Sequence, residues 1–145
     1  MLLPRRTLLA VAAVVDVALH ARPSPVAAKA LAARHNLPPR QLETVLQALV
    51  RQGILKGVRG PRGGYELARE RRRITAGDVV RAAMGAGGEE APPESPLVER
   101  VVGPALAEAD RACLAALDRI SIDDLCRAAE QDGRLRRAPA ADFTI

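Results

Sequence analysis

The fold of this chain is constrained most by a short run rich in glycine and arginine, residues 57–65, with the sequence GVRGPRGGY. This run separates two short segments, 54–58 and 65–67, whose composition favours β-strands, so it predicts the tip of a β-hairpin. Its glycines allow a sharp turn and its proline stiffens that turn. Arg59 and Arg62 stand at the tip with no acidic residue beside them. Such a hairpin suits a DNA minor groove, where negative potential is concentrated, although a solvated turn is the alternative interpretation.

The residues before the hairpin favour the first interpretation. Residues 39–52 have the periodicity of an amphipathic helix, with an apolar face made of Leu42, Val45, Leu46, Leu49 and Val50. The opposite face carries Arg40, Gln41, Glu43, Thr44 and Gln47. These residue types recognise the edges of guanine, adenine, cytosine and thymine, although ordinary solvent exposure would also explain a polar face. A shorter helix is expected at 27–35. Helix, tight turn, helix and basic hairpin, in this order, predict a winged helix-turn-helix.

The charge of the chain is divided between its two halves. Residues 1–75 contain 14 Lys and Arg against 4 Asp and Glu, whereas residues 76–145 contain 8 against 13. A basic first half indicates that this end meets a polyanion such as double-stranded DNA. Because 20 of the 22 cationic residues are arginine, a bias of genome composition could explain part of the high isoelectric point.

Length and composition limit the remaining possibilities. A chain of 145 residues fits one domain, or a small domain with an appendage. With one Tyr and one Phe, its core must consist of Leu, Val and Ala, and burial between subunits would supplement so thin a core. No apolar run reaches the length of a membrane span, so no membrane partner is expected. The two cysteines form no disulfide framework, which predicts a reducing, cytoplasmic location.

The first 20 residues allow two interpretations. Arg5 and Arg6, followed by the apolar run 8–15, resemble a secretory signal. Asp16 interrupts that run, and positions 8, 11, 12, 15 and 19 could also form the apolar face of a helix. We expect a helix packed on the helix-turn-helix core rather than an export signal.

At this point the residues resemble the Rrf-two type of bacterial winged-helix transcription regulators. The matching stretches are 10–19 (AVAAVVDVAL), 25–37, 42–43, 46–55 (LQALVRQGIL), 58–67 (VRGPRGGYEL) and 74–83 (ITAGDVVRAA). The resemblance implies a homodimeric DNA-binding regulator, more often a repressor than an activator, which binds an inverted-repeat site. It also implies that 39–52 is the recognition helix and that Arg59 enters the minor groove. A winged-helix protein-interaction module without specific DNA readout is the alternative.

The sequence departs from this family where a cofactor would bind. Many members hold an iron–sulfur cluster through three cysteines in the loop after the helix expected at 75–84. The corresponding segment, 85–96, contains no cysteine, and Cys113 and Cys126 lie beyond it. Because such clusters need thiolate ligands, we expect no cluster, no metal and no other cofactor. Cys113 is a candidate redox sensor, and a small buried apolar side chain is the alternative for both cysteines.

The second half predicts a helical appendage to a mainly α fold. Domain 1–84 carries the winged helix-turn-helix, and 85–96 is expected to be a flexible linker. Residues 97–117 predict a long helix, apolar on more than one face, that would form a dimer, followed by a terminal helix up to about residue 130. The tail 131–145 has no periodicity and is expected to be disordered.

Enzymatic chemistry is not expected from this sequence. It contains no phosphate-binding loop, no dinucleotide fingerprint and no Ser/His/Asp arrangement in a suitable context. His20 and His35 fall in separate predicted helices, and we expect no carboxylate or cysteine beside them at ligand spacing. No catalytic residue is therefore predicted.

Overall fold

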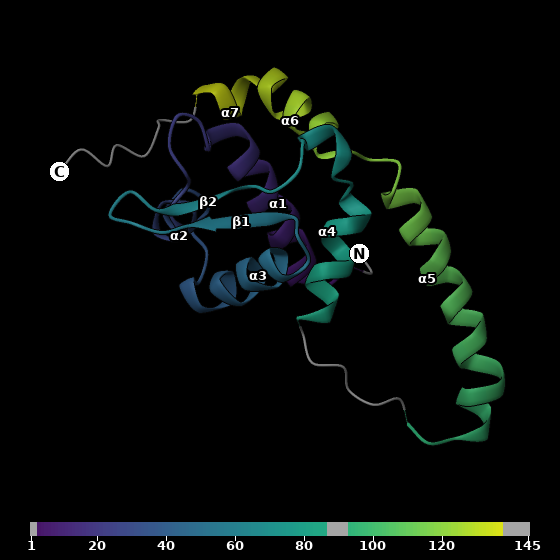
Figure 1. Ribbon diagram of the computed structural model, residues 1–145. Helices are drawn as coiled ribbons and strands as arrows, with labels where there is room; N and C mark the ends of the chain where they lie inside the picture. Colours follow the sequence, from purple (N-terminus) through teal and green to yellow (C-terminus); the bar gives the residue numbers. More distant parts are fainter. Residues whose placement is uncertain (1–2, 87–92, 138–145) are drawn as a thin grey trace.

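The structure is a computed structural model that describes residues 3–86 and 93–137. Its elements are α1 (Arg5–His20), α2 (Ala28–His35), α3 (Pro39–Arg51), β1 (Leu55–Val58), β2 (Gly64–Leu67), η1 (Arg71–Arg73), α4 (Ala76–Gly85), η2 (Val98–Val102), α5 (Gly103–Leu117), α6 (Ile122–Gln131) and α7 (Gly133–Arg137). The mainly helical fold with a small hairpin is confirmed (Figure 1). In the described part of the chain, no helix combines the length and apolarity needed to cross a membrane.

Helix α1 packs into the core through a face that only partly matches the prediction. Its buried residues are Thr7, Ala10, Ala13, Val14, Asp16 and Val17. Of the predicted positions, Val11, Val15 and Leu19 are partly buried against the core. Leu8, which was expected to face inward, is 42% exposed. The apolar positions run almost all round this helix, so their spacing alone could not identify the side that meets α3 and α4.

Helix α3 follows its predicted periodicity with one exception. Leu42, Val45, Leu46 and Leu49 are buried as expected, and Ala48 is buried with them. Val50 is instead 37% exposed. It lies in the last turn, where Gly53, with φ of 71°, ends the helix and leads the chain into the hairpin.

Helices α2 and α3 begin without side-chain caps, as their sequences predict. Ala27 and Pro38 occupy the two N-cap positions, and neither can accept a hydrogen bond through its side chain. Asn36 ends α2 in the left-handed conformation, with φ of 51°. This residue turns the chain toward α3, so Asn36 is a turn determinant that the periodicity did not identify.

The hairpin is attached to the rest of the domain by its second strand. Strands β1 and β2 are antiparallel, and Leu55 pairs with Leu67. On its other edge, Tyr65 exchanges backbone hydrogen bonds of 3.0 Å and 2.8 Å with Val26, the residue two positions before α2. The hairpin and the first helix of the helix-turn-helix are therefore joined directly.

Gly64 permits this attachment, because a Cβ atom there would lie 2.3 Å from the backbone oxygen of Val26. We expect Gly64→Ala to lower the free energy of unfolding by about 1–3 kcal/mol, the usual cost of overpacking. Gly57→Ala is the matched control, because a Cβ atom at Gly57 would meet nothing within 4 Å. Urea denaturation of both variants checks the prediction. Equal effects at the two glycines would contradict it.

The second half is attached through the starts of α4 and α6. Thr75 and Ser121 each begin a helix with a reciprocal capping box, with Asp78 and Asp124 as the partner residues. The two caps also form a β-bridge with each other. Next to it, the guanidinium of Arg81 donates two hydrogen bonds of 2.7 Å to the Asp118 carboxylate. The C-terminal end of α5 is thus held against α4.

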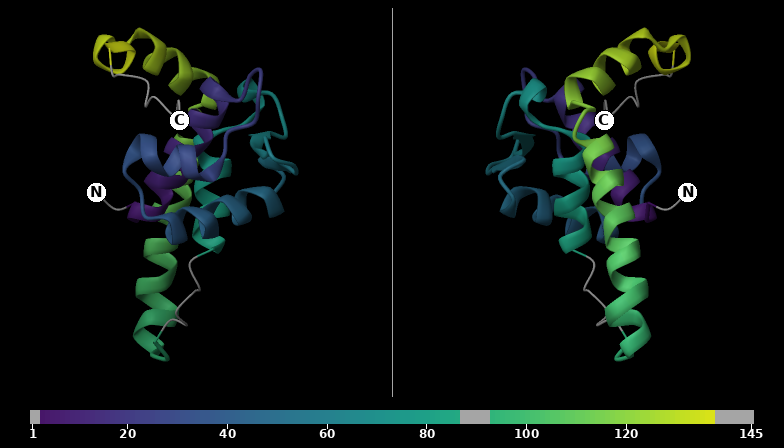
Figure 2. Two further views of the ribbon diagram at one scale, coloured as in Figure 1. Left: turned by 90° about the vertical axis from the view of Figure 1, so that its left-hand side faces the viewer. Right: turned by 90° about the vertical axis from the view of Figure 1, so that its right-hand side faces the viewer.

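Helix α5 extends beyond the rest of the molecule (Figure 2). It begins at Gly103 with Pro104 in its first turn, and the π-helical turn η2 leads into it. In the π turn, the Gly103 N–H donates a hydrogen bond to the Val98 carbonyl. The helical path therefore continues through Pro104, which has no N–H to donate. No residue of α5 is buried. A long helix is confirmed, and its apolar face has no partner in the described chain.

The C-terminal segment differs in part from its prediction. Helix α7 forms at Gly133–Arg137, because the Asp132 carboxylate accepts hydrogen bonds from the N–H groups of Arg134 and Leu135, at 2.8 Å and 3.2 Å. Predicting disorder for this part of the tail was therefore wrong. The remainder of the tail, 138–145, and most of the predicted linker, 87–92, lie outside the described residues.

Candidate nucleic-acid interface

The five predicted base-reading residues share the exposed face of α3. Arg40, Gln41, Glu43, Thr44 and Gln47 are all exposed. The Thr44 hydroxyl donates a 3.1 Å hydrogen bond to the Arg40 carbonyl, so its polar group is already used within the helix. Burial of the opposite face of α3 fixes the direction of this polar face.

The two predicted hairpin arginines, Arg59 and Arg62, are exposed at the tip. Gly60, with φ of 125°, provides the turn between them. Figure 1 shows the hairpin tip, α2 and the first turns of α3 on one side of the molecule, with α5 on the opposite side. The structure therefore brings the predicted residues of the helix and of the hairpin to one side.

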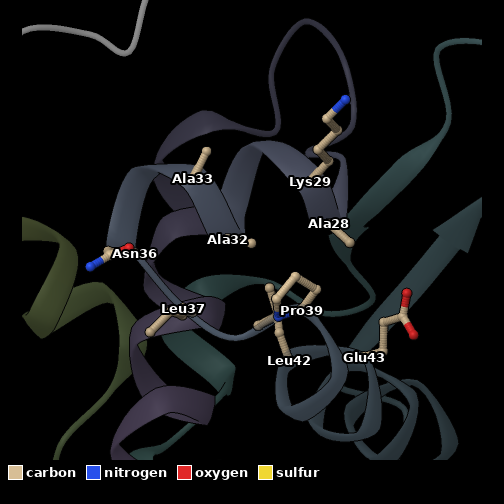
Figure 3. A pocket seen from close by; sticks show the side chains of 9 residues that line it. All are labelled: Ala28, Lys29, Ala32, Ala33, Asn36, Leu37, Pro39, Leu42 and Glu43. Atoms are coloured by element: carbon tan, nitrogen blue, oxygen red, sulfur yellow. The ribbon is translucent and has the colours of Figure 1, made fainter.

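A shallow groove of about 410 Å³ separates α2 from the start of α3. Its wall is mostly apolar, from residues such as Ala32, Pro39 and Leu42, and its charged lining residues are Lys29 and Glu43 (Figure 3). Lys29, on α2, was not among the predicted residues. Its position depends on how the two helices cross, so periodicity within α2 gave no indication of it.

A buried ionic cluster supports the helix-turn-helix from inside. The carboxylate of Asp16, on α1, accepts two hydrogen bonds from the Arg34 guanidinium, at 2.9 Å and 2.6 Å. The Nε2 atom of His35 lies 2.6 Å from the same carboxylate, and Nδ1 of His20 lies 3.5 Å from it. The expectation that no carboxylate lies beside these histidines was wrong, since Asp16 and His20 are one helical turn apart.

The ionisation of Asp16 follows from these contacts. Burial disfavours its charged form, but the hydrogen bonds from Arg34 and His35, with the charges of Arg34 and His20, outweigh burial and lower the pKa of Asp16 below its ordinary value of 3.8. Arg34 and His35 form the end of α2, so the charged carboxylate holds α2 against α1. This contact fixes the helix that precedes the turn into α3.

The two cysteines have different surroundings. Cys113 is exposed on α5, whereas Cys126 is buried on α6 and burial raises the pKa of its thiol. The interpretation as a small buried apolar side chain therefore fits Cys126 and does not fit Cys113 in the single chain. The redox role of Cys113 stays a prediction.

Comparison with known proteins now identifies the family. The model of the Rrf2 family, described as an iron-dependent transcriptional regulator, matches residues 3–128. The chain belongs to the Rrf2 family. A helix-turn-helix regulator from Synechocystis is 42% identical over 72 residues, which are 50% of this chain and 49% of that protein. The regulator IscR of Vibrio atlanticus is 40% identical over 73 residues, or 50% of this chain and 42% of that protein. The chain thus spans about half the length of the curated relatives it matches.

Solved structures of Rrf2 relatives share the fold over most of the chain. IscR of T. potens superposes with a TM-score of 0.69 at 30% identity, covering 89% of this chain and 88% of that one. CymR, the global cysteine regulator of B. subtilis, gives 0.66 at 25% identity, covering 88% and 98%. The winged helix-turn-helix with its C-terminal helices is therefore confirmed as the fold.

The residues of this Rrf2 chain do not fit the iron named in the family description. The described ranges 3–86 and 93–137 contain no group of three or more His, Cys, Asp or Glu side chains placed to hold a metal ion. The chain has two cysteines, and segment 85–96 contains neither. In the one place where a carboxylate meets two histidines, Arg34 already binds Asp16 with both hydrogen bonds, and its positive charge opposes a cation.

Proposed function

We propose that this protein is a sequence-specific DNA-binding transcription regulator of the cytoplasm that acts as a homodimer and represses its target genes. The observation that carries the proposal is the common orientation of the α3 polar face and the hairpin arginines. The shape and the charge of this surface agree with the proposal, because a recognition helix enters a major groove of DNA while a basic hairpin reaches the neighbouring minor groove.

We assign base readout to α3. Arg40 suits guanine, Gln41 and Gln47 suit adenine, and Glu43 suits the exocyclic amine of cytosine. The hydroxyl of Thr44 is already bonded to Arg40, so its methyl group is the part that suits thymine. Arg59 and Arg62 are assigned to the minor groove and its phosphates.

The unpartnered face of α5 supports the proposed dimer. Within α5, apolar or small residues recur at spacings of three and four residues at Leu106, Ala109, Cys113 and Ala116, and Val102 in η2 and Ile120 after α5 continue the series. This is the spacing of a helix-pairing seam. Leu106 is 62% exposed in the single chain, and Val101 beside the seam is 58% exposed. A two-fold dimer built on this seam would present two recognition helices to an inverted-repeat site.

Arg59→Ala tests the proposed function. Titration of the protein with DNA that carries its selected site, at several salt concentrations, should show weaker binding and a salt dependence reduced by about one phosphate contact. Arg119→Ala, which removes an exposed arginine far from the hairpin, should leave both quantities unchanged. If the wild-type protein shows no salt-dependent DNA binding, the alternative of a protein-interaction module takes its place.

Glu43→Ala should change the sequence that the protein prefers. Loss of one base contact should cost about 1–3 kcal/mol at the position that Glu43 reads and relax the preference for cytosine there. Selection of bound sequences from a random DNA pool measures the change. An unchanged selected sequence would show that α3 enters the groove in another orientation.

A further inference from the structure

A second groove lies apart from the proposed DNA-binding residues. It is bounded by the C-terminal end of α1 and the two residues that follow it, by β2 and η1, and by the start of α6. Its volume is about 740 Å³. We call it the arginine groove. Its lining residues include Val17, Ala21, Leu67, Arg22, Glu66 and Arg69. None comes from α2, from α3 or from the hairpin tip, and the volume falls within the range of small-molecule sites.

The arginine groove combines an apolar wall with positive charge that has no partner. Val17, Ala21 and Leu67 belong to the apolar wall. Arg22 and Arg69 also line the groove and are exposed, and neither forms an ion pair with any residue in the described ranges. Guanidinium groups at the edge of an apolar surface suit a ligand with a negatively charged head and an apolar body.

The end of the groove at α6 is held in place by a buried carboxylate. Asp123 is 5% exposed, and its Oδ1 atom forms an ion pair of 2.7 Å with Nε of Arg71. Its other oxygen accepts a hydrogen bond from Arg127. The charge of Arg71 is therefore matched within the protein, and Arg72 lies 3.9 Å from Glu70. The two arginines left for a ligand are Arg22 and Arg69, and Glu66 is the acidic lining residue that forms no ion pair with a described residue.

We propose that the arginine groove binds a small organic anion, a carboxylate or a phosphate monoester, whose head contacts Arg22 and Arg69 and whose apolar body lies on Val17, Ala21 and Leu67. Such a ligand would touch α1, the second strand of the hairpin and α6 at once. These elements connect the helix-turn-helix with helix α5. An effect of this ligand on DNA binding rests on the proposed function. The existence of the binding site does not depend on that function.

The test is a titration of the full-length protein without DNA, followed by two-dimensional amide NMR. Phenyl phosphate and benzoate serve as probes with both a charged head and an apolar body, and inorganic phosphate serves as the head alone. We expect at least one of the first two to give saturable shifts at Ala21, Arg22, Ala68 and Arg69. Phosphate alone should bind more weakly, because it makes no apolar contact. The stronger of the two organic probes distinguishes a phosphate head from a carboxylate head.

A matched pair of double variants makes the result decisive. Arg22→Ala with Arg69→Ala should weaken binding at least about tenfold, since two charge-assisted hydrogen bonds are lost. Arg100→Ala with Arg119→Ala removes the same charge from exposed positions outside the groove and should bind the probes like the wild type. The absence of saturable shifts up to about 10 mM probe, or equal weakening in both double variants, would overturn the proposal. Because no DNA is present, failure of the proposed function leaves this result intact.

Discussion

Leu106→Asp should convert the protein from a dimer to a monomer and should reduce its affinity for an inverted-repeat DNA site by a factor of about 100 or more. A charge in the middle of the α5 seam would be buried without a partner on association, and the seam lies on both chains, so each dimer would carry the change twice. Loss of the second half-site removes the gain from binding two sites at once, which is typically 10²–10⁴-fold. Sedimentation measures the first effect, and titration with DNA that carries the inverted repeat measures the second.

Ala115→Asp is the matched control for this experiment. Position 115 is nine residues from Leu106, half a turn round the helix axis, and its side chain is exposed. The control should remain dimeric and bind DNA normally. A dimer that tolerates Leu106→Asp, or a wild-type protein that sediments as a monomer both with and without DNA, would contradict the proposed seam.

The sequence was most informative where a pattern depends on neighbouring residues. The hairpin was predictable because its glycines and arginines form one continuous run, and α3 because its apolar residues repeat at regular intervals. The capping boxes at Thr75 and Ser121 depend on residues three positions apart, so they were also predictable. The exposure of all seven candidate DNA-binding residues follows from the same local patterns.

The features that were missed depend on residues far apart in the chain. The bond between Val26 and Tyr65 joins segments that no periodicity relates, so neither the attachment of the hairpin nor the requirement for Gly64 could be deduced. The buried side of α1 was assigned only partly correctly, because an apolar pattern shows that a helix packs but not against which neighbour. In that helix, Asp16 indicated only an interruption of the apolar run. Its partners Arg34 and His35 lie 18 and 19 residues away on another helix.

Asp16→Asn should destabilise the protein strongly at neutral pH. Breaking a wholly buried ion pair costs about 3–5 kcal/mol. The Arg34 side chain is 23% exposed and keeps some contact with water. We therefore expect the free energy of unfolding to fall by about 2–3 kcal/mol, less than for a wholly buried pair. Urea denaturation at pH 7 measures the change, with Asp110→Asn as the control, because Asp110 is exposed on α5 and forms no ion pair with a described residue.

The pH dependence distinguishes a role of the Asp16 charge from a loss of packing. The pKa of Asp16 is lower in the folded chain than its ordinary value of 3.8, so the unfolded chain binds the proton more readily. The stabilisation by Asp16 is therefore complete at pH values above 3.8 and is lost as the pH falls through the lower pKa of the folded state. The difference in unfolding free energy between the wild type and Asp16→Asn should shrink as the pH falls below 3.8. A difference that stays the same down to the lowest pH at which the protein folds would assign the effect of Asp16 to shape rather than to charge.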